Sequence, residues 1–248
     1  MASTIETGHA KNVAIFQQLT LYIAGFGTAY NPSNPALGIA ALQQLLAQAE
    51  AAVEQVNAAI PAHKNAISAR EAAFKPFNTL ITRVINALYA SQVSTPIKQN
   101  ARTLVRKLQG RRATPKASTH EPQEENTQVK EPRSISSAQL SYPNRLNTFD
   151  QLIKLLESLP EYAPNEPELT TAALTALYHQ LQSHNAAVVA AFVPLCNARI
   201  ARNRVLYNKT TGLLATANLC KLYCKSVFGT TSPQYQQIRS LKFKAKKE

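Results

Sequence analysis

The chain has 248 residues, of which 45% are hydrophobic, and it carries a formal net charge of +13. This apolar content is typical of a globular protein and excludes a wholly disordered one. No run of about 18 apolar residues is present, so we expect no membrane-spanning helix. The N-terminus also lacks the basic and apolar regions of a secretory signal.

The first predicted helix covers residues 10–24, and the turn AYNPSNPAL follows it. Asn34 or Ser33 is the predicted N-cap of the next helix, with Pro35 near its first helical position. That helix is long, because its apolar residues are spaced alternately four and three apart, as on the packed face of a coiled coil or bundle helix. These residues are Leu42, Leu46, Ala49, Val53, Val56 and Ile60. We expect Pro61 to kink this helix rather than end it.

A third helix is predicted over residues 78–90, after Pro76 ends the long one. A fourth opens at Thr95 and Pro96 and carries the basic sequence KQNARTLVRKLQG. Residues 111–140 are rich in Pro, Ser, Thr, Glu and Gln and lack apolar periodicity. This composition predicts a flexible linker.

The same pattern then recurs, which indicates an internal duplication. Phe16, Gln18 and Leu19 align with Phe149, Gln151 and Leu152. After removal of one residue from the first copy, Tyr30, Pro32, Pro35 and Leu37 align with Tyr162, Pro164, Pro167 and Leu169. The second long helix has its apolar face at Leu174, Tyr178, Leu181, Asn185, Val188 and Phe192, with Pro194 just beyond. A helix over 213–227 follows, and a last one opens at Ser232 and Pro233 with QQIRSLKFKAKK.

The fold class predicted is therefore all-α, since Ala is abundant and no Asn-Gly or Asp-Gly signal for a β-hairpin is present. We expect two homologous helical-bundle modules over residues 8–110 and 141–248, each built on a long antiparallel helical hairpin. The second module ends in a basic tail.

The candidate binding surface is basic and almost free of acidic residues. No Asp or Glu lies between Glu71 and Glu121, or between Glu168 and Glu248. Such a surface attracts nucleic acid, acidic proteins or anionic lipid headgroups. The candidate contact residues are Lys98, Arg102, Arg106, Lys107, Arg111, Arg112, Arg239, Lys242 and Lys244. The alternative interpretation is a solvated helix face with a basic tail.

Two repeated pairs, Asn65 with Arg70 and Asn197 with Arg202, indicate either a paired anion or partner site or a polar layer that fixes helix register. No GxSxG, P-loop or GxGxxG motif is present. His179 and His184 are five apart, which does not suit two metal ligands on one helix face. We expect no catalytic site, cofactor or metal. The three cysteines all lie in the second half, which favours a reducing cytoplasm.

The segments GHAKNVAIF, YNPSNPAL, NAISARE, TRVINAL, ARTLVRKLQG, NARIARNRVLY and KSVFGTTSPQY resemble a family of uncharacterised bacterial proteins. The resemblance extends over nearly the whole chain and includes a Pro-rich variable linker. It implies a duplicated all-helical protein in the bacterial cytoplasm. The family has no assigned activity, so the resemblance implies no site residue.

The function predicted from the sequence is that of a non-enzymatic interaction or scaffold protein. Its partner would be a protein or an anionic polymer that contacts the basic surface. The alternative is a nucleic-acid-binding protein that does not read sequence, because no helix-turn-helix, RRM or zinc-finger spacing is present. The two functions differ in whether nuclease treatment removes the partner.

Overall fold

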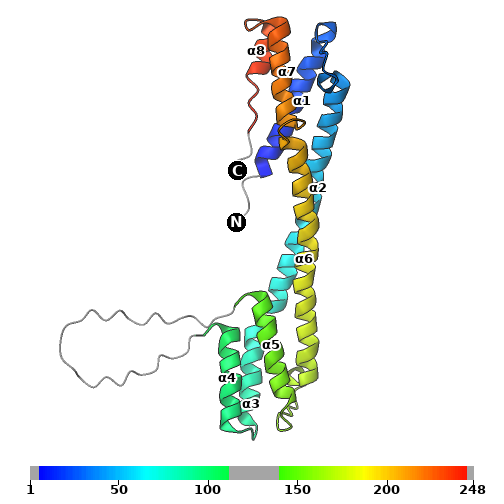
Figure 1. Ribbon diagram of the computed structural model, residues 1–248. Helices are drawn as coiled ribbons and strands as arrows, with labels where there is room; N and C mark the ends of the chain where they lie inside the picture. The colour runs from blue at the N-terminus through cyan, green and yellow to red at the C-terminus, as the bar shows by residue number, and fades with distance from the viewer. Residues whose placement is uncertain (1–5, 112–139, 245–248) are drawn as a thin grey trace, which may run out of the picture. The chain divides into compact units, whose positions relative to one another are not determined.

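The structure is a computed structural model that describes residues 6–111 and 140–244. Within these residues every regular element is a helix and no strand is present (Figure 1). The all-α prediction is therefore confirmed for the described part of the chain. The predicted linker, residues 111–140, lies outside the described residues except at its two ends.

The helices before the linker begin and end close to their predicted positions. They are α1 (Glu6–Gly25), α2 (Ile39–Phe74), α3 (Phe77–Ala90) and α4 (Thr95–Gln109), with the short 3-10 helices η1 (Gly27–Ala29) and η2 (Pro35–Leu37) between α1 and α2. After the linker come α5 (Tyr142–Glu157), η3 (Pro167–Leu169), α6 (Thr171–Tyr207), α7 (Leu213–Phe228) and α8 (Pro233–Arg239).

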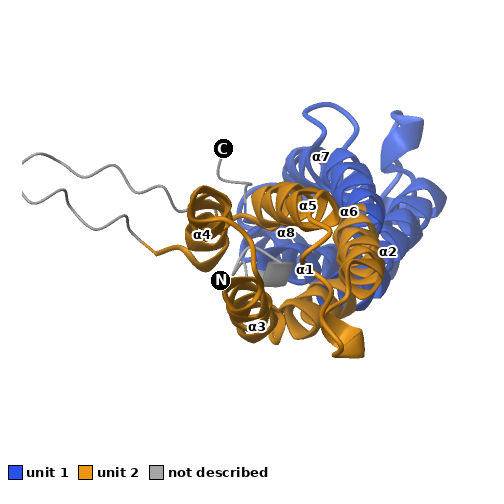
Figure 2. Cartoon of the chain, turned by 90° about the horizontal axis from the view of Figure 1, so that it is seen from below, with its two compact units in different colours: residues 1–64, 190–248 blue, residues 65–189 orange. Residues whose placement is uncertain are grey.

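The chain forms two compact units, and each is assembled from both halves of the sequence (Figure 2). Unit 1 comprises Met1–Lys64 and Ala190–Glu248, and unit 2 comprises Asn65–Val189. The unit boundaries fall inside α2 and α6. This differs from the prediction of modules over 8–110 and 141–248, because each predicted module is divided between the units. The physical reason is that α7 packs against α1 and η2, and α4 packs against α5, across the two halves of the sequence.

The core of unit 1 lies between α1 and the helices near the C-terminus (Figure 1). Phe16, Leu19 and Ile23 of α1 are fully buried, as are Leu213 and Cys220 of α7. The rings of Phe26 and Phe228 meet edge to face with centroids 5.3 Å apart. Both halves of the sequence therefore contribute to this core.

The core of unit 2 is built around a group of aromatic rings. Phe77 of α3 and Phe149 of α5 are almost fully buried, and their rings pack edge to face with centroids 4.9 Å apart. The ring centroids of Phe74 and Tyr142 are 4.8 Å apart, and these rings also meet edge to face. The Arg145 guanidinium lies 4.8 Å from the Phe77 ring centroid, a cation–π contact. Burial lowers the pKa of Arg145.

Both long helices continue through their internal prolines, as predicted. α2 contains Pro61, and α6 contains Pro194. Alternate positions of the predicted apolar faces are buried in both helices: Leu42, Ala49, Val56, Leu174, Leu181 and Val188. Phe192 departs from the pattern, because 44% of it is exposed.

The turn before each long helix has the same hydrogen bond in both halves. The Tyr30 hydroxyl donates to the Leu37 carbonyl at 2.9 Å, and the Tyr162 hydroxyl donates to the Leu169 carbonyl at 2.9 Å. Burial raises the pKa of both tyrosines, and that of Tyr162 reaches about 12. Asn34 acts as an N-cap, since its side chain accepts from the Ala36 amide. It caps η2, however, and the long helix begins only at Ile39, so the predicted helix start was wrong.

The last predicted helix is also shorter than expected. α8 ends at Arg239, so Lys242 and Lys244 lie beyond it in non-helical chain. The reason is tertiary: Asn12 of α1 hydrogen-bonds both the amide and the carbonyl of Lys244, and Lys221 Nζ donates to the Leu241 carbonyl. These contacts satisfy backbone groups that a longer helix would pair internally.

Candidate anion-binding surface

The helix α4 presents an apolar face to unit 2 and a basic face away from its core. Ala101, Val105 and Leu108 are buried. Arg102 is exposed and Arg106 is partly exposed, one turn further along the helix. The helix ends at Gly110, whose φ of 67° is left-handed. Glycine adopts this conformation without strain, so it reverses the chain and brings Arg111 back beside the helix.

The helices α3 and α4 run antiparallel, and hydrogen bonds join them at both ends. Gln109 Nε2 donates to Thr82 Oγ1 at 2.9 Å. At the other end, Lys98 Nζ donates to the carbonyls of Tyr89 and Ser91, both at 2.9 Å. The outer side chains of the two helices are thereby fixed opposite one another.

A hollow of about 290 Å³ lies on the surface where these helices meet. We call it the arginine hollow. It is lined from α3 by Thr82, Ile85, Asn86 and Tyr89, and from α4 and the residues just after it by Arg102, Val105, Arg106, Gln109 and Arg111. The apolar residues of this set contribute a hydrophobic surface, and the arginines and amides supply hydrogen-bond donors.

Among the residues that the structure describes, no carboxylate lines the arginine hollow. Among the described residues, the ion pairs are Arg83 with Glu168 and Lys154 with Asp150, so neither involves an arginine of the hollow. Three guanidinium groups therefore share one concave surface without a carboxylate of this part of the chain to neutralise them. A planar guanidinium matches the oxygens of a phosphate or carboxylate with two parallel hydrogen bonds, so the hollow is suited to an anion.

The structure thus brings together three of the predicted contact residues, Arg102, Arg106 and Arg111. Lys98 belongs to a different arrangement, because its ammonium group binds carbonyls at the C-terminal end of α3. A cation there is stabilised by the helix dipole, which gives Lys98 a structural role. Lys107 does not line the hollow. Arg112 lies outside the described residues.

The remaining predicted contact residues lie in unit 1. Arg239 is the exposed last residue of α8, and Lys242 and Lys244 are exposed beyond it. The two basic stretches therefore lie on two different units. In unit 2 the basic residues lie on a helix, whereas in unit 1 Lys242 and Lys244 lie on non-helical chain.

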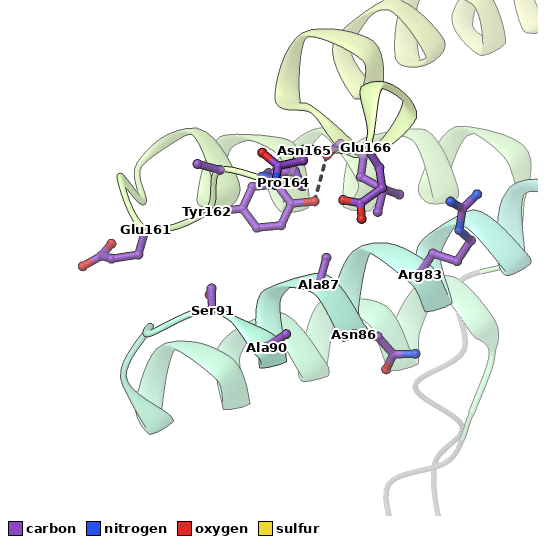
Figure 3. Close-up of a pocket in the computed structure, with 12 residues that line it drawn as sticks. Arg83, Asn86, Ala87, Ala90, Ser91, Glu161, Tyr162, Pro164, Asn165 and Glu166 are labelled. Carbon is purple, nitrogen blue, oxygen red and sulfur yellow. Dashed lines mark hydrogen bonds between the residues drawn. The ribbon is translucent and has the colours of Figure 1, made fainter.

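A second hollow of about 550 Å³ lies in unit 2 between α3 and the turn before α6 (Figure 3). Glu161 and Glu166 line it, together with Arg83 and Asn86. Arg83 also pairs with Glu168, and this hydrogen bond with its charge holds the pKa of Glu168 below its ordinary value. The Ser91 hydroxyl donates to the Leu88 carbonyl, and no His or Cys lines the hollow. The Tyr162 hydroxyl likewise donates to a backbone carbonyl, that of Leu169, so both hydroxyls of the lining are engaged with the main chain.

The two buried thiols of α7 act as small apolar groups. Cys220 and Cys224 are both fully buried. Burial raises the pKa of Cys220 to about 11 and that of Cys224 to about 12. A thiol is a nucleophile or metal ligand only when deprotonated, and these groups stay protonated near neutral pH. No group of three potential metal ligands occurs among the residues that the structure describes.

Of the repeated arginines of the long helices, Arg202 is buried and Arg70 is partly buried. The Arg70 guanidinium lies 3.9 Å from the Tyr142 ring centroid, and Arg202 is 4% exposed and hydrogen-bonds Asn203. These contacts favour the polar-layer interpretation over an open anion site.

The sequence prediction missed the residues that α3 contributes to the hollow. Thr82, Asn86 and Tyr89 are spaced four and three apart, which places them on one face of a helix. This spacing was visible in the sequence. The pairing of that face with α4 was not, because it depends on how the two helices pack.

Comparisons with protein-family models, curated proteins and solved structures found no match. The described helices include none that is both long enough and apolar enough to cross a bilayer.

Proposed function

We propose that this is a non-enzymatic helical interaction protein that binds an anionic partner through the arginine hollow. The observation that carries the proposal is the convergence of Arg102, Arg106 and Arg111 on one surface without a carboxylate. The net charge of +13 adds a long-range attraction for anions. A cytoplasmic location stays a prediction from the sequence.

The scaffold role is supported by the rigid base under these arginines. α4 is fixed on one side by α5 and on the other by α3, and its apolar face is buried in the core of unit 2. An anion-binding surface on packed helices holds its donors in position before the partner arrives, so binding loses less conformational entropy.

We also infer that the chain arose by tandem duplication, with the copies interleaved rather than folded separately. Support comes from the shared hydrogen bond of Tyr30 and Tyr162 and from the internal prolines of α2 and α6. Unit 1 takes α1 from one copy and α7 with α8 from the other. Unit 2 takes α3 and α4 from the first copy and α5 from the second.

The test is binding of long-chain inorganic polyphosphate, which offers charge without bases or side chains. We expect the full chain to bind it, and the variant R102Q/R106Q/R111Q to lose most of that affinity. The matched control K225Q/R239Q/K242Q removes the same charge from exposed positions of unit 1. Isothermal titration calorimetry at low salt measures both, and circular dichroism checks that each variant stays folded.

Equal losses for the two triple variants would show that the attraction comes from net charge, and would contradict a defined site. Unchanged binding by R102Q/R106Q/R111Q would also contradict the proposal. A pull-down with nuclease-treated and untreated lysate then separates a protein partner from a nucleic acid.

A further inference from the structure

We propose that the arginine hollow is a binding site for single-stranded nucleic acid, in which one base stacks on Tyr89 and successive phosphates bind the arginines of α4. This inference rests on the proposed anion-binding function and names its partner. The observation behind it is an aromatic ring within the same hollow as three arginines that take part in neither ion pair of the described residues.

Tyr89 is available for stacking. It lies near the C-terminal end of α3, lines the arginine hollow and is 40% exposed. Its backbone is held by Lys98, whose ammonium group binds the Tyr89 carbonyl. A ring that is exposed on a fixed backbone provides a stacking platform at low entropic cost, because only its side-chain torsions remain to be ordered.

The arginines form a row rather than a cluster. Arg102 and Arg106 are four residues apart, and this separation corresponds to a rise of about 6 Å along a helix. Arg111 continues the row beyond Gly110. A single phosphate would need donors that converge on one point. A row of separate cations suits a chain of successive phosphates, such as the backbone of an extended single strand.

The antiparallel packing of α3 and α4 sets the order of groups along the hollow. Tyr89 lies at the end near Arg102, and Thr82 lies at the other end, where it binds Gln109. Asn86 and Arg106 lie between them. The Asn86 amide has donors and an acceptor for a base edge. A base on Tyr89 would thus have its phosphate near Arg102, with the next phosphates toward Arg106 and Arg111.

A duplex and an acidic protein fit this arrangement less well. Paired bases are stacked inside a duplex and cannot offer a face to Tyr89 without being unpaired, which costs free energy. An acidic peptide offers a ring only where its sequence contains an aromatic residue, whereas every nucleotide of a strand carries a base. Among polyanions, an unpaired strand uses the arginines and the aromatic ring together.

The experiment compares a fluorescently labelled 15-nucleotide oligothymidylate with the same strand annealed to its complement, by fluorescence anisotropy of the full chain. We expect the single strand to bind more tightly than the duplex. The substitution Tyr89→Leu keeps an apolar side chain and removes the ring. It should weaken single-strand binding by roughly 5- to 150-fold, the range for loss of one base–aromatic stack.

Polyphosphate separates this inference from the proposed function. Y89L should bind polyphosphate as the unmodified chain does, because no ring contact is involved. For R102Q/R106Q/R111Q, the slope of log affinity against log salt should become shallower by about 2 on the single strand, as expected when three phosphate contacts are removed. The control K225Q/R239Q/K242Q should leave that slope nearly unchanged.

Three results would overturn the inference: equal affinity for strand and duplex, no loss with Y89L, or tighter binding of a phosphoserine peptide than of the oligothymidylate. If polyphosphate still requires the arginines in those cases, the proposed anion-binding function stands and only the nucleic-acid assignment fails. If polyphosphate does not bind, both fail.

Discussion

The helices α4 and α8 hold equivalent positions in the predicted repeat, yet they end in different ways. α4 has 15 residues and ends at a left-handed glycine, whereas α8 has 7 residues and ends where the chain leaves to meet Asn12. The basic residues of unit 2 therefore line a hollow on a helix pair, and those of unit 1 lie on exposed chain. Position in a repeat thus does not decide the role of a residue. Its packing neighbours decide it: they are α3 of the same half for α4, and Asn12 of the other half for the chain after α8.

Both cores contain aromatic contacts. Phe74, Phe77 and Phe149 make them in unit 2, and Phe26 with Phe228 in unit 1, where Cys220 also lies beside Tyr30. Both cores use helices from both halves of the chain, so each half should depend on the other for stability.

The largest expected effect follows from separating the halves. Residues 1–111 alone lack α5 against α4 and α7 against α1, so most of their apolar surface has no partner. We expect this fragment to show no cooperative urea transition by circular dichroism, and we expect a transition to return when residues 140–248 are added. A cooperative transition of the fragment alone, at the midpoint of the full chain, would instead favour self-contained modules.

The next effect compares two equivalent core positions. Phe16 of unit 1 and Phe149 of unit 2 are both fully buried. Replacement of either by Ala should lower the free energy of unfolding by about 3–5 kcal/mol, because the side chain's transfer energy is lost and a cavity remains. Urea unfolding of F16A and F149A measures both. A cost below about 1 kcal/mol at either site would show that its core collapses around the gap.

A smaller effect is expected at Gly212, in the turn that joins α6 to α7. A Cβ atom there would lie 2.5 Å from the backbone nitrogen and oxygen of Asn208. Gly212→Ala should destabilise unit 1 by about 1–3 kcal/mol through this overlap. Gly25→Ala is the matched control, since no atom lies within 4 Å of its added carbon. Equal midpoints for the two variants in urea would contradict the predicted overlap.

The last effect is absent at neutral pH and is a loss of stability at alkaline pH that centres on unit 1. Folding raises the pKa of Cys220 to about 11 and that of Cys224 to about 12, from an ordinary value of 9.0. The unfolded thiols therefore lose their protons first, and stability that is complete below about pH 9 should fall as pH rises toward the folded pKa values. Urea midpoints measured from pH 8 to pH 11 test this.

The double variant C220A/C224A is the control for the alkaline effect. It should start from lower stability, because two buried side chains are smaller, but its midpoint should fall less steeply with pH. A slope equal to that of the unmodified chain would assign the effect to other groups, of which Tyr30 is the first candidate because burial raises its pKa too.

Several elements were predictable because their signals are local. The spacing of Leu42, Ala49 and Val56 indicated the buried face of α2, and Ser232 before Pro233 indicated the start of α8, where the Ser232 side chain accepts from the Tyr235 amide. The end of α8 was not predictable, since it depends on Asn12, which lies more than two hundred residues away in the sequence.

The candidate site likewise combines residues that local signals predicted with residues that only packing revealed. Arg102 and Arg106 were predicted from their spacing, whereas Tyr89 and Asn86 joined them only through packing. By itself the sequence determined which segments become helices and which side chains share a helix face, because periodicity and capping act within a few residues. The tertiary structure decided which helices pair. Apolar faces of similar composition occur in both halves, and only their detailed shape selects between a partner in the same half and one in the other.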